Sequence, residues 1–190
     1  MLKPTKEDLA AAAGKTLPDV IASDLDILFC GINPGLYTAA VRQHFGRPGN
    51  RFWPTIHRAG FTPRLLHPSE QRELLKHGYG ITNLVARATV AADELTAEEL
   101  IEGARRLEKK VKRYRPRVLA VVGIGAYRAA FERPRAKMGL QPETIGASAI
   151  WNLPNPSGLN ANYRPEDFVR LFGELRDYVN AARRAAEAER

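Results

Sequence analysis

Residues 26–35 read Asp-Ile-Leu-Phe-Cys-Gly-Ile-Asn-Pro-Gly and limit the folds that this chain can adopt. A short apolar run that ends in turn residues is typical of a strand buried on both faces. Gly31 and Gly35 let a ligand approach the main chain, and Pro34 keeps Asn33 out of the α region. We therefore predict a buried strand that presents Asn33 at its carboxyl end, where open α/β sheets bind ligands. An ordinary turn is the alternative.

Further apolar runs alternate with helical patterns along the rest of the chain. Residues 118–122 read as a second buried strand, and residues 80–85 and 145–153 hold further strand patterns. Thr96 and Glu99 form a capping box, which marks the start of a long helix. This alternation predicts an α/β protein with a central, mainly parallel sheet flanked by helices on both faces.

A chain of 190 residues suits one domain with a substantial core. We expect a helical extension over residues 1–24, the main domain over residues 25–180, and a frayed tail over residues 181–190. Residues 123–125 read Gly-Ile-Gly after a strand, but Arg128 stands where a dinucleotide-binding fingerprint has its third glycine. This glycine pair therefore does not predict a dinucleotide site.

Composition narrows the class of partner. The formal net charge of +8 favours a polyanionic partner, nucleic acid before membrane. The single cysteine, Cys30, excludes an internal disulfide and reads as a small buried hydrophobe. The four histidines lack ligand spacing, so we predict no metal. No apolar run reaches membrane length and the first ten residues lack a signal-peptide core, so we expect an intracellular protein with no membrane partner.

Three separated motifs carry a family resemblance. They are residues 31–35 (Gly-Ile-Asn-Pro-Gly), 50–53 (Asn-Arg-Phe-Trp) and 155–159 (Asn-Pro-Ser-Gly-Leu). In this order they closely resemble the mismatch-specific uracil/thymine-DNA glycosylase branch of the uracil-DNA glycosylase superfamily, over about residues 25–179. The resemblance implies a monofunctional enzyme that needs no cofactor and excises uracil paired with guanine in double-stranded DNA. We expect a cytoplasmic monomer that associates with the nucleoid through DNA, and thymine or other damaged pyrimidines are possible further substrates.

The resemblance also assigns roles to individual residues. Asn33 would position the attacking water, and Phe45 would stack on the flipped base. Main-chain N–H groups of the first loop would stabilise negative charge on the departing pyrimidine. The base pocket would comprise Gly31, Ile32, Pro34, Gly35 and Phe45.

The second motif would enter the DNA stack where the base has left and contact the unpaired guanine. Leu159 would be the wedge, and Gly158 would supply a main-chain contact. Relatives often carry an arginine just beyond this motif, where this chain has Ala161 after Asn160. This difference puts one phosphate or opposite-strand contact in doubt. The residues of this wedge loop are Asn155, Pro156, Ser157, Gly158, Leu159 and Asn160.

An asparagine amide orients water but does not take its proton at neutral pH. A carboxylate that reached the pocket would speed the attack, and Asp93 is the candidate. However, Asp93 and Glu94 precede Thr96, the N-cap of the long helix, where negative charge is favourable for purely structural reasons. Both roles remain open for Asp93.

Several residues have structural alternatives. Residues 155–158 form a sequence typical of a plain turn, and Phe45 is open to a core role. Phe52 and Trp53 are assigned to the core, with Asn50 as a cap. The rival function is a non-catalytic protein that binds damaged or single-stranded DNA on the same fold. A nucleotide or phosphoester hydrolase would need clustered carboxylates for a metal, and the candidate loops contain none.

Overall fold

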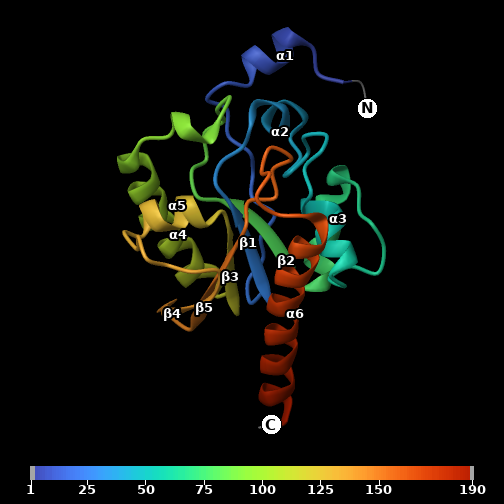
Figure 1. Ribbon diagram of the computed structural model, residues 1–190, viewed down its shortest axis with the longest axis vertical. Helices are drawn as coiled ribbons and strands as arrows, with labels where there is room; N and C mark the ends of the chain where they lie inside the picture. Colours follow the sequence, from blue (N-terminus) through green and yellow to red (C-terminus); the bar gives the residue numbers. More distant parts are fainter. Residues whose placement is uncertain (1–2, 189–190) are drawn as a thin grey trace.

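The computed structural model describes residues 3–188 and shows one five-stranded sheet between two layers of helices (Figure 1). The strand order is β2-β1-β3-β5-β4, and only the pairing of β4 with β5 is antiparallel. The predicted α/β class with a mainly parallel central sheet is thereby confirmed. The strands are β1 (Ile27–Gly31), β2 (Tyr79–Asn83), β3 (Val118–Val122), β4 (Gly139–Ile145) and β5 (Ser148–Leu153).

Helices connect these strands and cover both faces of the sheet. The α-helices are α1 (Lys6–Ala11), α2 (Leu36–Val41), α3 (Phe52–Arg58), α4 (Ala97–Tyr114), α5 (Ile124–Ala130) and α6 (Pro165–Ala188). Two 3-10 helices, η1 (Pro68–His77) and η2 (Ala92–Glu94), lie in the connections. The capping box predicted for α4 is present, because the Thr96 side chain accepts from Glu99 N and the Glu99 side chain accepts from Thr96 N. Within residues 3–188, no helix has both the length and the apolar character that crossing a bilayer requires.

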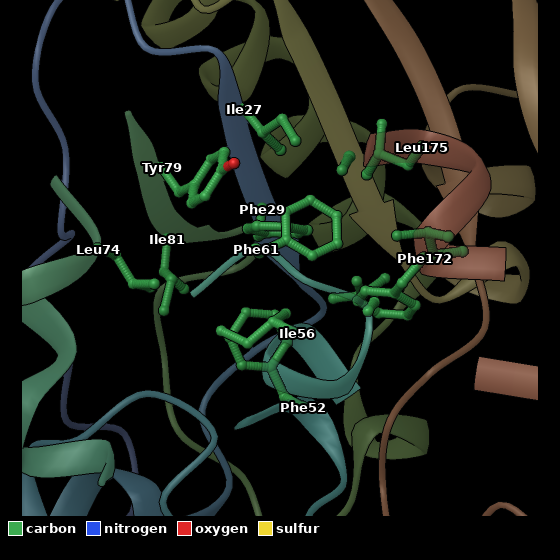
Figure 2. Packing of buried hydrophobic residues seen from close by; sticks show 14 of the residues in the cluster. Ile27, Phe29, Phe52, Ile56, Phe61, Leu74, Tyr79, Ile81, Phe172 and Leu175 are labelled. Carbon is green, nitrogen blue, oxygen red and sulfur yellow. The ribbon is translucent and has the colours of Figure 1, made fainter. Parts of the chain in front are cut away.

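The face covered by α3 and α6 has an aromatic core. Phe29 of β1 is fully buried and makes edge-on contacts with Phe52 and Phe61, at ring-centroid distances of 5.3 and 5.7 Å (Figure 2). Phe172 of α6 also stacks on Phe29, with ring centroids 6.2 Å apart. Burying one such ring contributes roughly 2–3 kcal/mol. The aromatic cluster therefore fixes α3 and α6 against β1, the strand that leads into the candidate site.

The opposite face packs aliphatic residues against α4 and α5. Leu28 and Cys30 of β1 point to this face and contact a cluster that includes Leu107 and Leu119. Every residue of β1 is buried, as predicted for a strand covered on both faces. Burial raises the pKa of the Cys30 thiol to about 12, so Cys30 behaves as a small hydrophobe.

The described part of the predicted N-terminal extension, residues 3–24, contacts the edge of the sheet. Val20 and Ile81 exchange main-chain hydrogen bonds of 2.9 and 2.7 Å, so the segment covers part of the outer edge of β2. Leu17 and Val20 are buried. Gly80 permits this approach, because a Cβ atom there would lie 2.5 Å from the carbonyl oxygen of Val20.

At the C-terminus, the frayed tail expected over residues 181–190 stays a prediction. Helix α6 continues to Ala188, and residues 189–190 lie outside the described part of the chain. Alanine, arginine and glutamate are strong helix formers, which suits this extension. Arg183 also pairs with Asp26 at 3.3 Å, close to the start of β1. Figure 1 shows the end of α6 projecting beyond the sheet.

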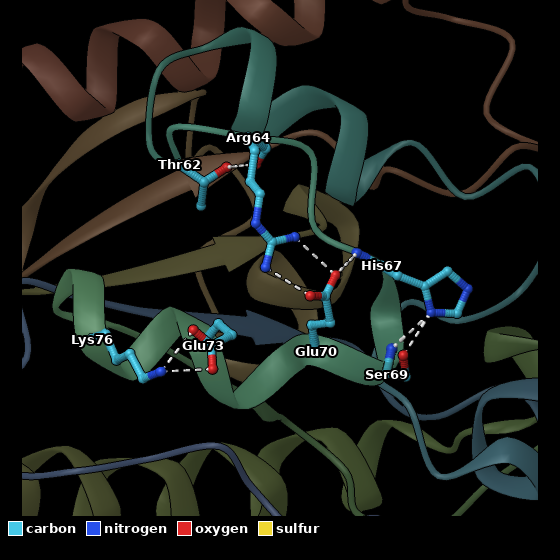
Figure 3. Close-up of polar contacts among 7 residues, drawn as sticks. All are labelled: Thr62, Arg64, His67, Ser69, Glu70, Glu73 and Lys76. Atoms are coloured by element: carbon cyan, nitrogen blue, oxygen red, sulfur yellow. Dashed lines mark hydrogen bonds and ion pairs between the residues drawn. The ribbon is translucent and has the colours of Figure 1, made fainter.

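Helix η1 is held by polar contacts at its start (Figure 3). The Glu70 carboxylate accepts from the Arg64 guanidinium at 2.7 and 3.1 Å and from His67 N at 2.9 Å. The hydrogen bonds from Arg64 are the main reason that the pKa of Glu70 falls to about 2. Gln71, the next residue of η1, accepts a 2.7 Å hydrogen bond from His44 N and so connects this helix to the candidate site.

Candidate active site

The four parallel strands direct their carboxyl ends to one edge of the sheet. At this edge, Gly31 of β1 is in register with Asn83 of β2. Val122 of β3 is likewise in register with Leu153 of β5. The order reverses here, because β2 and β3 lie on opposite sides of β1. Such a switch point is the usual ligand-binding position in open α/β sheets. In Figure 1 this edge faces α1 and α2.

The loop after β2 runs alongside the predicted pocket loop, residues 31–35. Leu84 N donates to Gly31 O at 2.8 Å, and Val85 N donates to Ile32 O at 2.9 Å. A third main-chain hydrogen bond, from Thr89 N to Pro34 O, spans 3.1 Å. The two loops therefore form one main-chain unit at the switch point.

This unit fixes the side chain of Asn33. Its Nδ2 donates to Arg87 O at 3.1 Å and to Thr89 Oγ1 at 2.7 Å. A carbonyl oxygen only accepts, so the contact with Arg87 determines which end of the amide is the NH2 group. Among residues 3–188, no hydrogen bond uses Oδ1 of Asn33, and the residue is half-buried. Asn33 thus presents an oriented acceptor at the site.

Arg87 is in turn held by the start of α4. Its guanidinium donates through Nε and Nη2 to the two carboxylate oxygens of Glu99, at 2.5 and 2.9 Å. These hydrogen bonds are the main reason that the pKa of Glu99 falls to about 2, and they raise the pKa of Arg87. Glu99 also completes the capping box with Thr96. The carbonyl group that orients Asn33 is therefore connected to the first turn of a long helix.

Asn83, to which the sequence analysis assigned no role, lies beside Gly31 and Phe45 at the end of β2. A Cβ atom on Gly31 would lie 2.7 Å from Asn83 Oδ1 and 3.4 Å from Phe45 Cζ. The absence of a side chain at Gly31 thus leaves room for an amide and an aromatic ring beside the main chain. The available signal was an asparagine at the carboxyl end of a strand, but the sequence does not reveal that β2 neighbours β1.

Phe45 packs against the core through one face of its ring, and its predicted stacking on a base stays a prediction. One face of its ring stacks on Phe52, with centroids 4.1 Å apart and an interplanar angle of 20°, and the residue remains half-buried. Its φ of +52° lies in the left-handed region, which costs a residue other than glycine about 1 kcal/mol or more. The main chain of His44 holds this conformation: its N–H donates to Gln71 Oε1 at 2.7 Å, and its carbonyl oxygen accepts from Trp53 Nε1 at 3.0 Å.

The ring of His44 connects this segment to Asn83. Its Nε2 lies 3.0 Å from Pro18 O and its Nδ1 lies 3.5 Å from Asn83 Nδ2. Because the carbonyl of Pro18 only accepts, Nε2 carries the proton and Nδ1 is the acceptor for Asn83. Burial lowers the pKa of His44, which keeps the ring neutral at neutral pH. The neutral ring directs the NH2 end of the Asn83 amide toward itself.

The wedge loop follows β5 and is closed by its own side chains. Asn155 Oδ1 accepts from Ser157 N at 3.0 Å, and Asn160 Nδ2 donates to Asn155 O at 3.0 Å. Leu159 is 79% exposed, which is unusual for a large apolar side chain. Ala161, which stands where relatives often carry an arginine, is also exposed.

The remaining predicted residues differ in their proximity to this site. Ile32 packs beside the end of β3, where a Cβ atom on Gly123 would lie 3.0 Å from it. Asp93 is exposed in η2, and within residues 3–188 no hydrogen bond or ion pair joins it to Asn33. Over the same residues, no group of three His, Cys, Asp or Glu side chains is arranged to hold a metal ion.

Comparison with known proteins places this arrangement in a family. The family model described as the uracil DNA glycosylase superfamily matches residues 18–176. The fold resembles the solution NMR structure of a candidate uracil DNA glycosylase from Methanosarcina acetivorans, with a TM-score of 0.56 and 20% sequence identity. That match covers 86% of this chain and 98% of the other. The chain belongs to the uracil-DNA glycosylase superfamily.

Proposed function

We propose that the protein is a DNA glycosylase that flips uracil out of a pair with guanine and hydrolyses its N-glycosidic bond. The observation that carries this proposal is the oriented amide of Asn33, whose Oδ1 has no hydrogen-bond partner among residues 3–188 and which follows Gly31 by two residues. Membership of the uracil-DNA glycosylase superfamily supports a role on DNA. The net charge of +8 suits a polyanionic partner.

Base recognition follows from the chemistry of the Asn83 amide. At two adjacent positions of its Watson–Crick edge, uracil offers the acceptor O4 and the donor N3–H. An amide offers the complementary donor and acceptor. Cytosine has the reverse pattern at these positions. Because His44 directs the NH2 end of Asn83, the amide orientation selects the uracil pattern. The face of Phe45 that does not stack on Phe52 is the stacking surface for the base.

The reaction breaks the bond between C1′ of the sugar and N1 of the base. The electron pair of this bond leaves with the base, and main-chain N–H groups of residues 31–35 stabilise the resulting anion. A water hydrogen-bonded to Asn33 Oδ1 then forms the new C–O bond at C1′. Asn33 orients this water but does not accept its proton, which passes to solvent or to the departing base. Such a catalyst gains selectivity from mispairs, which flip at a lower cost.

Alkali cleavage of product DNA tests the proposal. The protein is incubated with duplexes that contain uracil opposite guanine, and alkali then breaks the strand only at an abasic site. We expect breakage at the uracil position with the wild-type protein and strongly reduced breakage with Asn33→Ala. Binding without breakage would instead support the non-catalytic DNA-binding alternative. A panel with thymine opposite guanine, uracil opposite adenine and single-stranded uracil defines the substrate range.

A further inference from the structure

We infer that Arg51 is a positioning residue for the wedge loop and that the start of α3 connects this loop to the base pocket. The inference rests on the proposed function. It assigns a role to residues 50–53, the motif Asn-Arg-Phe-Trp, which the base pocket and the wedge do not explain by themselves.

The guanidinium of Arg51 binds two carbonyl groups of the wedge loop and a third just beyond its end. Nη2 donates to Ser157 O at 2.6 Å and to Asn160 O at 2.7 Å, and Nη1 donates to Tyr163 O at 3.0 Å. The main-chain N–H of Arg51 also donates to Pro156 O at 2.9 Å. Four hydrogen bonds from one residue therefore define the path of the chain on both sides of Leu159.

This position requires the shape of an arginine. The guanidinium lies over the ring of Phe168, 4.3 Å from its centroid, as a planar cation stacked on an aromatic face. Among the described residues, its buried Nε has no hydrogen-bond partner, while both terminal nitrogens are engaged. A lysine carries the same charge but lacks the rigid planar fork that reaches three carbonyl groups at once.

The two residues that follow Arg51 in α3, Phe52 and Trp53, contact the segment that carries Phe45. Phe52 stacks on Phe45, and Trp53 Nε1 donates to the carbonyl oxygen of His44. The wedge loop also touches the segment that precedes α3, because a Cβ atom on Gly158 would lie 2.7 Å from the carbonyl oxygen of Gly49. The first turn of α3 thus sets the distance between the pocket and Leu159. Flipping requires this fixed distance, since the wedge fills the gap while the base enters its pocket.

The test compares Arg51→Lys with Arg176→Lys. Arg176 donates through Nη1 to Ala59 O at 2.5 Å, at the other end of α3, and it does not bind the wedge loop. We expect Arg51→Lys to lower single-turnover excision from duplex U·G DNA by roughly 10- to 100-fold, because misplaced groups lose about that factor. Excision from single-stranded DNA, where nothing needs a wedge, should change less than about twofold. Arg176→Lys should leave the ratio of the two rates unchanged.

Two further measurements separate a positioning role from a general loss of folding. In the double variant Arg51→Lys with Leu159→Ala, duplex excision should be close to that of Leu159→Ala alone, because the two changes remove the same contribution. Hydrogen exchange at the amides of Leu159 and Asn160 should accelerate in Arg51→Lys, while the amides of β1 remain protected.

Equal losses on both substrates, additive effects in the double variant, or unchanged exchange in the loop would each overturn the role of Arg51. Failure of the proposed function has a different signature, since the wild-type protein would then leave U·G DNA intact. The exchange measurement needs no DNA and therefore tests the contact between Arg51 and the loop in either case.

Discussion

Gly31 and Asn83 face each other across neighbouring strands so closely that a Cβ atom on Gly31 would lie 2.7 Å from Asn83 Oδ1. The amide of Asn83 therefore occupies the space that any other residue at position 31 would need for its side chain. This relationship makes the pocket sensitive to the smallest possible substitution.

Gly31→Ala should displace the Asn83 amide and lower the single-turnover rate of uracil excision by about tenfold or more, as expected when a positioned hydrogen-bonding group is lost. Gly31 does not have a positive φ, so the substitution introduces crowding without backbone strain. Gly125→Ala is a suitable control, because a Cβ atom there has no neighbour within 4 Å. An unchanged rate in Gly31→Ala would show that the Asn83 amide is not part of the pocket.

Asn33→Ala should reduce single-turnover excision by roughly 100-fold or more, because the acceptor that orients the water is removed. Binding to U·G DNA should persist, since Asn33 makes its two hydrogen bonds within the protein. Binding is measured by fluorescence anisotropy and excision by alkali cleavage. Parallel losses of binding and excision would argue against a role in positioning water.

Asp93→Asn should retain the wild-type excision rate, because Asp93 is exposed and does not contact Asn33. Asparagine keeps the shape of the side chain and removes its ability to accept a proton. Wild-type rates would leave Asp93 with a structural role only, as a favourable negative charge ahead of α4. A large loss of rate with an unchanged melting temperature would instead make this carboxylate the base.

Leu159→Ala should impair excision from duplex DNA far more than from single strands, because the apolar insert that holds the stack open is lost. The side chain is 79% exposed, so the free energy of unfolding should change by no more than about 0.5 kcal/mol. Single-turnover rates on both substrates and thermal melting provide the measurements. A similar loss on both substrates would mean that Leu159 contributes to the structure of the protein and does not hold the base in its flipped position.

Acid should weaken the interaction between Arg87 and the Glu99 carboxylate in a defined pH range. The folded-state pKa of Glu99 is about 2, below its usual value of 4.5, so its stabilising contribution is complete above about pH 4.5. That contribution is lost as the pH falls toward 2 and the carboxylate becomes protonated. Glu99→Gln should therefore show a smaller decrease in melting temperature than wild type over this range.

Glu166→Gln is the control for this titration, because its ion pair with Arg58 is long, at 3.7 Å, and exposed. It should follow the wild-type curve. Identical curves for wild type and Glu99→Gln would contradict the inferred coupling between Glu99 and Arg87.

Binding to DNA should weaken steeply with salt, because lysine and arginine side chains must displace counterions from phosphates. Excision should continue in excess EDTA, since the proposed chemistry uses only protein groups and water. Anisotropy titrations at several salt concentrations test the first expectation. A flat salt response would oppose the assignment of DNA as partner, and loss of activity in EDTA that a divalent metal restores would oppose the mechanism.

The sequence predicts the local features of this fold well. The apolar run that ends at Gly31 is a buried strand, and the Thr96–Glu99 capping box starts a helix, because both patterns depend on residues close in the chain. Phe52 and Trp53 are core residues as predicted. The carboxyl-end loop of β1 also lies at the switch point where ligands bind.

The missed features depend on contacts between distant segments. The role of Asn83 requires β2 to lie beside β1, and strand order is not encoded in local periodicity. Arg51 binds carbonyl groups more than one hundred residues away in the sequence. Every residue type carries a main-chain carbonyl group, so the sequence does not identify these acceptors. The pairing of Val20 with Ile81 is likewise a contact between distant segments that local periodicity does not reveal.

The burial of Cys30 has a practical consequence for following the wedge during catalysis. Burial raises the pKa of the Cys30 thiol to about 12, so the reactive thiolate is scarce at neutral pH, and burial also shields the sulfur from reagents. A cysteine introduced at the exposed position of Ala161 would thus be the single site open to a maleimide dye, and Leu159 would stay in place. The protein can be labelled beside the tip of the wedge loop without first removing a native thiol, so the proposed entry of this loop into DNA can be followed in real time.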